Sequence, residues 1–478
     1  MKTATVLFLL FAAFINCLGQ SSQSERQQFI RVEAPVVALL HVRVIDGTGA
    51  TPLDDQTIII AAGKIQSIAP TTTANVPAHA ATLDLKGYTV LPGLVGMHDH
   101  MFFPMGGNPP IYSNMSSSFP RLYIALGVTT IRTTGSVAPD SDLEVKKLID
   151  ADRMIGPKMH ITAPYLEGAG SFTPVMHTLS GPEDARRMVN FWADQGATSF
   201  KAYMNITRDE LRAAVEEAHK RGLKVTGHLC SIGYREAAEI GIDNLEHGLL
   251  PDSEFVPNKK PEQCPAGVNA SLRDLDLNSD PVKELIRTLV AKHVAITSTL
   301  PVFEAGAPLT QKGIGAASAV LNPRVLSVMN NDARVRYLTN RSRIAADSPT
   351  AILVRKSMDF ERAFVAAGGL LLAGLDPTGN GGIVAGFGDL REVELLVEAG
   401  FTPVEAVKIA SFNGAKFLGE DARIGTIATG KQADLMIVKG DPSANIADIE
   451  KVEIVFKDGV GYDSEKLIQS VQGLVGIR

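Results

Sequence analysis

The chain has 478 residues, of which 45% are hydrophobic and 21% are charged, and its formal net charge is −6 at pH 7. This composition is typical of globular proteins, and the length allows one large domain together with a smaller one. Because there is no excess of basic residues, we expect no nucleic-acid partner.

The first 20 residues resemble a cleaved secretory signal peptide. Lys2 precedes an apolar core from about Val6 to Ile15, and small and polar residues follow it. The apolar core is shorter than the roughly 20 residues that span a bilayer, and no later segment is a better candidate for a membrane span. We therefore expect a secreted or periplasmic protein. An N-terminal anchor helix, or lipid attachment at Cys17, is the alternative.

Cysteines are scarce in the mature chain. Only Cys230 and Cys264 follow the predicted signal, too few for a disulfide framework even in an oxidising compartment. A single bridge cannot be inferred from the sequence. We interpret Cys230 as a small buried apolar side chain.

Both ends of the mature chain have the pattern of β-strands. Residues 36–91 alternate apolar and polar side chains between turn signals, and residues 423–462 have the same alternating pattern. This period of two predicts short antiparallel strands. Neither segment alone makes a convincing core, so we expect the two to form one small composite β-sandwich, followed by a C-terminal tail at 463–478.

The middle of the chain, residues 92–422, alternates short apolar runs with amphipathic helical stretches, as parallel βα units do. Eight such runs occur, from LPGLVGMHDH to GGLLLAGLDPTG. They predict an α/β fold of the (β/α)8 TIM-barrel type, with enlarged loops at 251–280 and 301–349. Enzymes of this fold carry their chemistry at the C-terminal ends of the strands.

Six polar residues that could bind metal or take part in catalysis lie at the C-terminal ends of these runs. They are His98, His100, Lys201, His228, His247 and Asp376. Alternate side chains of a strand share a face, so His98 and His100 should point into one pocket and Asp99 away from it. Lys201, His228 and His247 follow one another at about one βα repeat, which predicts that neighbouring strands aim them into the same pocket.

The residue types suit metal binding. Neutral imidazoles and a carboxylate are ligands for zinc and similar ions, and this set is large enough for two ions if another group bridges them. An ammonium beside two cations would be repelled. Lys201 must therefore be neutral, displaced, or converted into an anion such as a carbamate.

On these motifs the chain resembles the amidohydrolase superfamily, particularly its binuclear imidazolonepropionase-like and dipeptidase-like branch, from about Val36 to Tyr462. The resemblance implies a cofactor of two divalent ions, with zinc expected. Many relatives have an aspartate where this chain has Gly96, which bears on the subgroup more than on catalysis. The implied ligands are His98, His100 and Asp376 for one ion, His228 and His247 for the other, and carboxylated Lys201 as the bridge.

We predict an enzyme that hydrolyses a C–N bond in a small molecule, with a dipeptide or N-acyl amino acid as the leading substrate. Two ions sharing a water would lower its pKa and create a hydroxide nucleophile. Asp376 would accept the proton and pass it to the leaving nitrogen. One alternative is an esterase, lactonase or phosphotriesterase with the same site. Another is a non-catalytic binding protein, against which the full set of metal positions argues.

Substrate contacts are less determined by the sequence. His177, Tyr203 and Tyr234 lie after strands on the predicted catalytic side and are our candidates. Arginines within 331–343 could receive a carboxylate, but we prefer to interpret that run as a solvated helix face. A homo-oligomer is compatible with the sequence. The remaining histidines are assigned to structure: His41, His79, His160, His219 and His293.

Overall fold

The computed structural model describes residues 26–106, 110–379 and 381–477. The predicted signal peptide, residues 1–20, lies outside the described residues. Within the described ranges, none of the helices combines the length and the apolar character that a membrane span requires.

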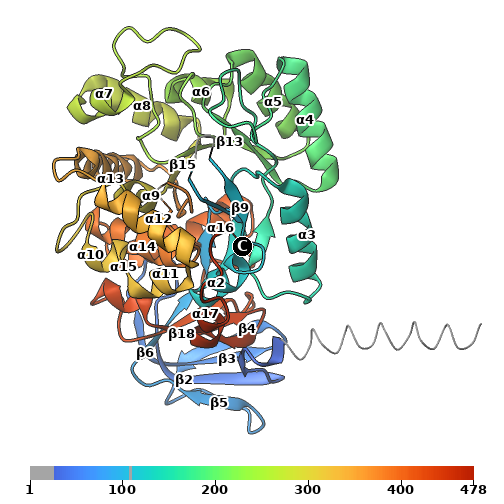
Figure 1. Cartoon of the computed structure of the whole chain (residues 1–478). Coiled ribbons are helices and arrows are strands. Elements are labelled where there is room, and N and C mark those ends of the chain that lie inside the picture. Colours follow the sequence, from blue (N-terminus) through green and yellow to red (C-terminus); the bar gives the residue numbers. More distant parts are fainter. Residues whose placement is uncertain (1–25, 107–109, 380, 478) are drawn as a thin grey trace, which may run out of the picture.

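The two ends of the chain meet in one nine-stranded sheet. Its strands are β1 (Ile30–Val32), β2 (Val36–Val44), β3 (Leu53–Ala61), β4 (Lys64–Pro70), β5 (Ala81–Asp84), β6 (Tyr88–Pro92), β17 (Leu435–Lys439), β18 (Val452–Lys457) and β19 (Val460–Asp463). The order is β1-β19-β18-β17-β6-β2-β3-β4, with β5 beside β2. Figure 1 shows the blue N-terminal strands and red β18 together at the foot of the molecule. The expected pairing of the two chain ends is therefore observed.

The sheet is held by a core of its own. Val37 and Leu39 of β2 and Ile58 and Ile60 of β3 are buried in one cluster with residues of the C-terminal strands, such as Phe456. These side chains come from both sequence segments, so neither segment could bury its apolar face without the other.

Each of the eight predicted apolar runs contains a strand. The strands are β7 (Leu94–Gly96), β10 (Val128–Arg132), β11 (Lys158–His160), β12 (Ser199–Ala202), β13 (Lys224–Gly227), β14 (Asn244–Glu246), β15 (Ala295–Ser298) and β16 (Leu371–Ala373). All are paired in parallel, in a sheet of order β11-β10-β7 and a sheet of order β12-β13-β14-β15-β16.

Backbone hydrogen bonds connect the two parallel sheets at both of their edges. Met97 N donates to Ala373 O at 2.8 Å, which links the end of β7 to β16, and Ala163 N donates to Ser199 O at 3.0 Å, which links the segment after β11 to β12. The parallel α/β arrangement predicted from the sequence is confirmed.

Helices follow most of these strands. Those of the middle segment are α2 (Phe119–Ala125), α3 (Pro139–Asp150), α4 (Pro182–Gln195), α5 (Arg208–Lys220), α6 (Tyr234–Ile240), α7 (Val268–Asp274), α8 (Asp280–Ala291), α9 (Leu300–Glu304), α10 (Ala317–Val320), α11 (Pro323–Val328), α12 (Asn331–Ser342), α13 (Thr350–Ala366), α14 (Phe387–Glu398), α15 (Pro403–Lys408), the π-helix η1 (Ile409–Asn413) and α16 (Gly414–Leu418). The enlarged loop at 301–349 thus carries α10 to α12.

Helix α5 shows how local sequence sets a helix. Thr207 and Glu210 form a capping box at its start, in which the Glu210 carboxylate accepts a hydrogen bond from Thr207 N at 2.9 Å. Leu211, Ala214 and Ala218 lie on its buried face at spacings of three and four residues. This face packs toward the strands and α4, as the amphipathic pattern predicts.

The C-terminal segment is part of the folded core rather than a tail. It forms α17 (Ser464–Gln469), in which Ser464 Oγ donates to Ala125 O at 2.6 Å. Val475 N donates to Val328 O at 2.9 Å. Leu467 and Val471 are fully buried, because their spacing of four residues places them on one side of a helical turn. The 3-10 helix η2 (Ile446–Glu450) precedes β18.

Cys230 and Cys264 form a disulfide, with a Cα–Cα distance of 4.8 Å. The sequence left this pairing open; Cys230 is buried, as expected, and its sulfur is part of the bridge. The bridge joins the segment that follows β13 to the loop between β14 and α7. Only the return of that loop over the strand end brings the two cysteines together, which no sequence spacing reveals.

Candidate active site

Six polar side chains predicted from the sequence converge at the C-terminal ends of the parallel strands. Lys201 lies on β12, and His228 and His247 come directly after β13 and β14. His98 and His100 follow β7, and Asp376 follows β16. All six line one cavity: His98, His100, Lys201, His228, His247 and Asp376.

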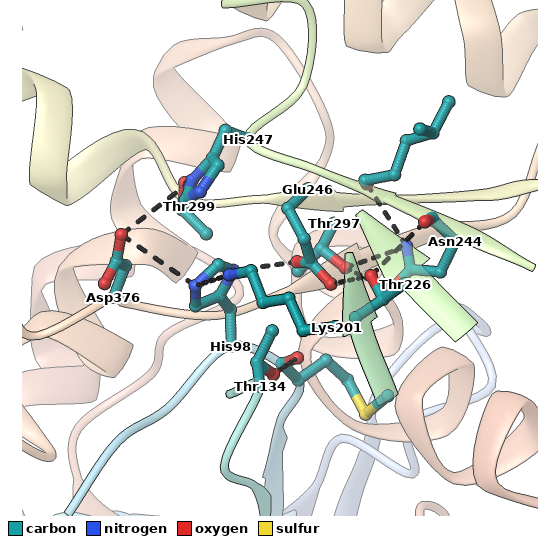
Figure 2. A network of polar contacts seen from close by, with 12 residues as sticks. His98, Thr134, Lys201, Thr226, Asn244, Glu246, His247, Thr297, Thr299 and Asp376 are labelled. Carbon is teal, nitrogen blue, oxygen red and sulfur yellow. Dashed lines mark hydrogen bonds and ion pairs between the residues drawn. The ribbon is translucent and has the colours of Figure 1, made fainter. Parts of the chain in front are cut away.

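The distances within this group are short. Lys201 Nζ lies 3.1 Å from His98 Nε2, and that nitrogen lies 3.8 Å from Asp376 Oδ2. His100 Nε2 lies 3.4 Å from Asp376 Oδ1. The ring centroids of His228 and His247 are 4.6 Å apart. Figure 2 shows His98 at the centre, between the lysine, Asp376 and Glu246.

The two histidines of the first motif face the cavity for a different reason from the one predicted. Strand β7 ends at Gly96, so His98 and His100 lie beyond it. After the strand, Met97 N and Asp99 N bond to opposite neighbours, Ala373 O at 2.8 Å and Arg132 O at 3.1 Å. Met97 and His98 form a bend, and with these two bonds in place both histidine side chains line the cavity without a regular strand.

Asp99 points away from the cavity, as predicted. Its carboxylate occupies the space beside Gly96, where an added Cβ would lie 2.0 Å from Asp99 Oδ2. Burial raises the pKa of Asp99 well above its ordinary value. The absence of a side chain at Gly96 is therefore a packing requirement of Asp99 in this chain.

Each of three histidines is held through its Nδ1 atom. Nδ1 of His98 lies 2.7 Å from Glu246 Oε2, that of His100 lies 3.0 Å from Gly135 O, and that of His247 lies 2.7 Å from Thr299 Oγ1. A proton on Nδ1 leaves the lone pair on Nε2. Metal-binding histidines are commonly oriented in this way.

Glu246 belongs to a buried polar network that the sequence analysis missed. Its Oε1 accepts a hydrogen bond from Arg132 Nη2 at 2.7 Å, and the same nitrogen donates to Asn244 Oδ1 at 2.8 Å. Thr226 Oγ1 also donates to Glu246. Figure 2 shows Thr226, Asn244 and Glu246 together to the right of His98. The sequence did contain a sign of this network: Arg132 and Glu246 are charged residues within the apolar strand runs GVTTIRTTG and IDNLEHG.

Burial governs the protonation of the cavity. It lowers the pKa of His98 to about 4 and that of His228 to about 3, with the Lys201 charge as the second cause. Burial also lowers the pKa of Lys201 to about 8. Burial would raise the pKa of Asp376, but the neighbouring histidines hold it well below its ordinary value. Neutral imidazoles and an ionised carboxylate are the forms that bind a divalent cation.

The donor set fits a divalent ion. One ligand atom each from His98, His100 and Asp376 can lie within 4.8 Å of one another, and all three residues are buried. His247 and Asp376 adopt left-handed backbone conformations, with φ of 72° and 47°. Such conformations are uncommon for residues other than glycine and collect at functional sites.

The cavity has a volume of about 510 Å³ and a largely apolar wall. Beyond the six polar residues, the residues that line it are Phe102, Pro104, Gly106, Pro110, Tyr112, Val137, Tyr165, Phe172, Met176, Tyr203, Val302, Phe303, Thr378 and Gly379. Phe102 belongs to β8 (Phe102–Pro104) and Tyr112 to β9 (Tyr112–Asn114). Of the predicted substrate contacts, Tyr203 is in the wall.

His177 and Tyr234 are not among the described residues that line the cavity. His177 Nε2 lies 3.0 Å from Asp184 Oδ2, and the side chain is 43% exposed. Tyr234 is fully buried, and its hydroxyl donates to Glu246 O at 2.9 Å. Both side chains therefore have partners outside the cavity lining: His177 contacts Asp184 in the first turn of α4, and Tyr234 contacts the end of β14.

The histidines assigned to structure also lie outside the described lining of the cavity. Three of them contact a carboxylate elsewhere: His41 with Asp55, His160 with Glu420, and His219 with Asp243.

A profile of the Amidohydrolase family matches residues 89–460. The chain belongs to the amidohydrolase family. It is therefore a hydrolase that acts on carbon–nitrogen bonds, in a family that generally uses divalent metals and small-molecule substrates. No curated protein sequence matches this amidohydrolase.

Solved structures share the fold of this amidohydrolase over most of its length. A proposed prolidase from Bifidobacterium longum is 25% identical, with a TM-score of 0.64, covering 91% of this chain and 98% of its own. A Xaa-Pro dipeptidase with bound methionine in its active site is 20% identical, with a TM-score of 0.64 and coverage of 90% and 100%. Bottromycin amidohydrolase is 20% identical, with a TM-score of 0.66 and coverage of 92% and 91%.

Proposed function

We propose that this amidohydrolase is an exported binuclear metalloenzyme that hydrolyses the amide bond of a small molecule. The observation that carries the proposal is the convergence of four histidines, Lys201 and Asp376 in one cavity at one end of the parallel strands. His98, His100 and Asp376 would hold one divalent ion, expected to be zinc. His228 and His247 would hold the other.

Lys201 is proposed to bridge the ions as a carbamate. Its Nζ lies 3.1 Å from His98 Nε2 and is almost fully buried. An ammonium at this position would repel both cations, whereas a carbamate supplies two anionic oxygens. Its formation joins the neutral amine to carbon dioxide and releases one proton.

When bound, the ions would acidify a water molecule and polarise the scissile carbonyl. Asp376 would accept the proton of the attacking water at a carboxylate oxygen and deliver it to the leaving nitrogen. A C–O bond forms, the C–N bond breaks, and the products are a carboxylic acid and an amine.

Dipeptides and N-acyl amino acids contain such a bond and are the first substrates to assay. The names prolidase and Xaa-Pro dipeptidase among the similar structures support their inclusion.

The finer architecture is also a proposal. We infer that the two parallel sheets close into a (β/α)8 barrel within residues 92–422, which the backbone hydrogen bonds at both sheet edges support. The nine-stranded sheet would curl over its shared core as the composite sandwich. The disulfide supports export, since such bonds persist in oxidising compartments.

Metal analysis joined to an activity screen tests the proposal. We expect about two equivalents of metal per chain and hydrolysis of at least one amide in a dipeptide and N-acyl amino acid library. His228→Ala should lower both, while His219→Ala, a histidine outside the described lining of the cavity, should lower neither. The proposal of a binuclear metalloenzyme would be rejected if the protein bound well under one equivalent of metal after zinc or manganese was supplied and hydrolysed no substrate.

A further inference from the structure

The wall of the cavity is aromatic where it meets the proposed metal ligands. Phe102 stacks on His100 with centroids 4.4 Å apart at 25°. Tyr203 lies 4.9 Å from His228, and Phe303 lies 5.7 Å from His247. A group attached next to the scissile bond would therefore contact aromatic rings.

The aromatic surface continues toward the mouth of the cavity. The ring centroids of Tyr165 and Tyr203 are 4.9 Å apart, and those of Phe172 and Tyr203 are 6.3 Å apart. Phe172 is 51% exposed although it is a large hydrophobic side chain. A hydrophobic substrate would cover part of this exposed ring and gain the free energy of its burial.

Within the described lining of the cavity, charged side chains are confined to the proposed metal site. Among the described residues that line the cavity, the histidines aside, only Lys201 and Asp376 are ionisable at neutral pH. The arginines of α12 do not join them. Arg336 of α12 and Arg343, which follows the helix, line an adjoining cavity that shares Pro104, Gly106 and Gly379 with this one. Arg336 Nε lies 2.9 Å from Asp332 Oδ2 of the same helix.

Apart from Lys201, the described residues that line the cavity would therefore offer a substrate carboxylate aromatic rings and no cation. Burying an unpaired charge is costly. An uncharged amide meets no such cost, and the hydroxyls of Tyr112, Tyr165 and Tyr203 offer it hydrogen-bond donors.

We propose that the preferred substrate is an uncharged amide with an aromatic group close to the scissile bond, and that free dipeptides and free N-acyl amino acids are weaker substrates. This inference rests on the proposed amidohydrolase function and narrows its substrate class. The physical basis is the aromatic wall together with the confinement of charge to the six polar residues.

A matched pair of anilides tests the inference with the full-length, metal-loaded enzyme. The pair is phenylacetanilide and the same compound with a 4-carboxylate on the aniline ring, which differ mainly in charge. We expect kcat/KM for the neutral anilide to exceed that for the carboxylate by at least about tenfold. Glycyl-phenylalanine should be a poorer substrate than the neutral anilide.

Two variants probe the wall. Phe172→Ala should raise KM for the neutral anilide about three- to tenfold and change kcat less, because contact area is lost far from the reacting atoms. Phe191→Ala, an equally exposed phenylalanine on α4, serves as the control. Val137→Arg places a cation in the half-buried part of the wall and should shift preference toward the carboxylate.

The outcomes separate the two proposals. Equal rates for the pair, or preference for the carboxylate, would overturn the substrate class and leave the amidohydrolase function standing. Hydrolysis of neither anilide, of no dipeptide and not even of p-nitrophenyl acetate, with two metals bound, would overturn the proposed function and this inference with it.

Discussion

Glu246 Oε2 lies 2.7 Å from Nδ1 of His98, and both side chains are fully buried. The carboxylate orients the ring so that Nε2 faces the cavity.

Glu246→Gln should lower metal affinity and kcat/KM about 10- to 100-fold, as is typical for partners of metal-binding histidines. Metal titration and steady-state kinetics measure both. Glu216→Gln, an exposed glutamate on α5, is the control, and unchanged affinity in Glu246→Gln would contradict the orienting role.

Lys201→Ala removes the proposed bridge between the two ions. We expect kcat to fall by at least about a hundredfold, and bicarbonate with a short-chain carboxylic acid to restore part of it by replacing the lost oxygens. Lys220→Ala, at a lysine 64% exposed on α5, should behave like the parent. A Lys201→Ala enzyme with full turnover would exclude the carbamate from the mechanism.

Removal of metal by a chelator should abolish hydrolysis and lower thermal stability together. Ligands that bind only the folded state stabilise it by about 2.7 kcal/mol at a hundredfold excess over Kd. The measurements are activity and Tm before chelation, after it, and after zinc or manganese is returned. Activity that survives complete chelation would show that the ions are not required.

The Cys230–Cys264 bridge closes a loop across 34 residues beside His228. Replacing both cysteines with serine should lower the free energy of unfolding by about 2–4 kcal/mol, because the unfolded chain regains conformational freedom. Denaturant unfolding under non-reducing conditions measures this. Reductant should lower the free energy of unfolding of the parent toward that of the variant. If reductant also destabilised the variant, the loss of stability would have a cause other than the disulfide.

Glu361 of α13 is fully buried, and burial raises its pKa from 4.5 to about 7. Between these values the folded protein retains a proton that the unfolded chain releases, so this group's contribution to stability falls as pH rises and levels off above about 7. Glu361→Gln should therefore gain stability relative to the parent between about pH 5 and pH 8, on the order of 3 kcal/mol. Urea unfolding of the parent and the variant at pH 5 and pH 8 measures this change. If the difference in unfolding free energy between the two proteins were the same at both pH values, the raised pKa of Glu361 would be contradicted.

Much of the site could be predicted because parallel βα repeats make strand ends coincide. His228 and His247 follow neighbouring strands, so their meeting depended only on recognising the strands, which the apolar runs reveal. His177 and Tyr234 were candidates on the same reasoning, but they are not among the described residues that line the cavity. Strand order predicts which end of the sheet a residue occupies, whereas the direction of a loop side chain depends on local partners such as Asp184.

The sequence by itself determined the parallel α/β core, the pairing of the two chain ends and the six polar residues of the site, because periodicity and strand-end position are local properties. Only the tertiary structure decided the Glu246 contact with His98, the disulfide and the aromatic wall. Each of these joins residues from different strands or loops, and their distances are set by how the whole chain packs rather than by any spacing along it.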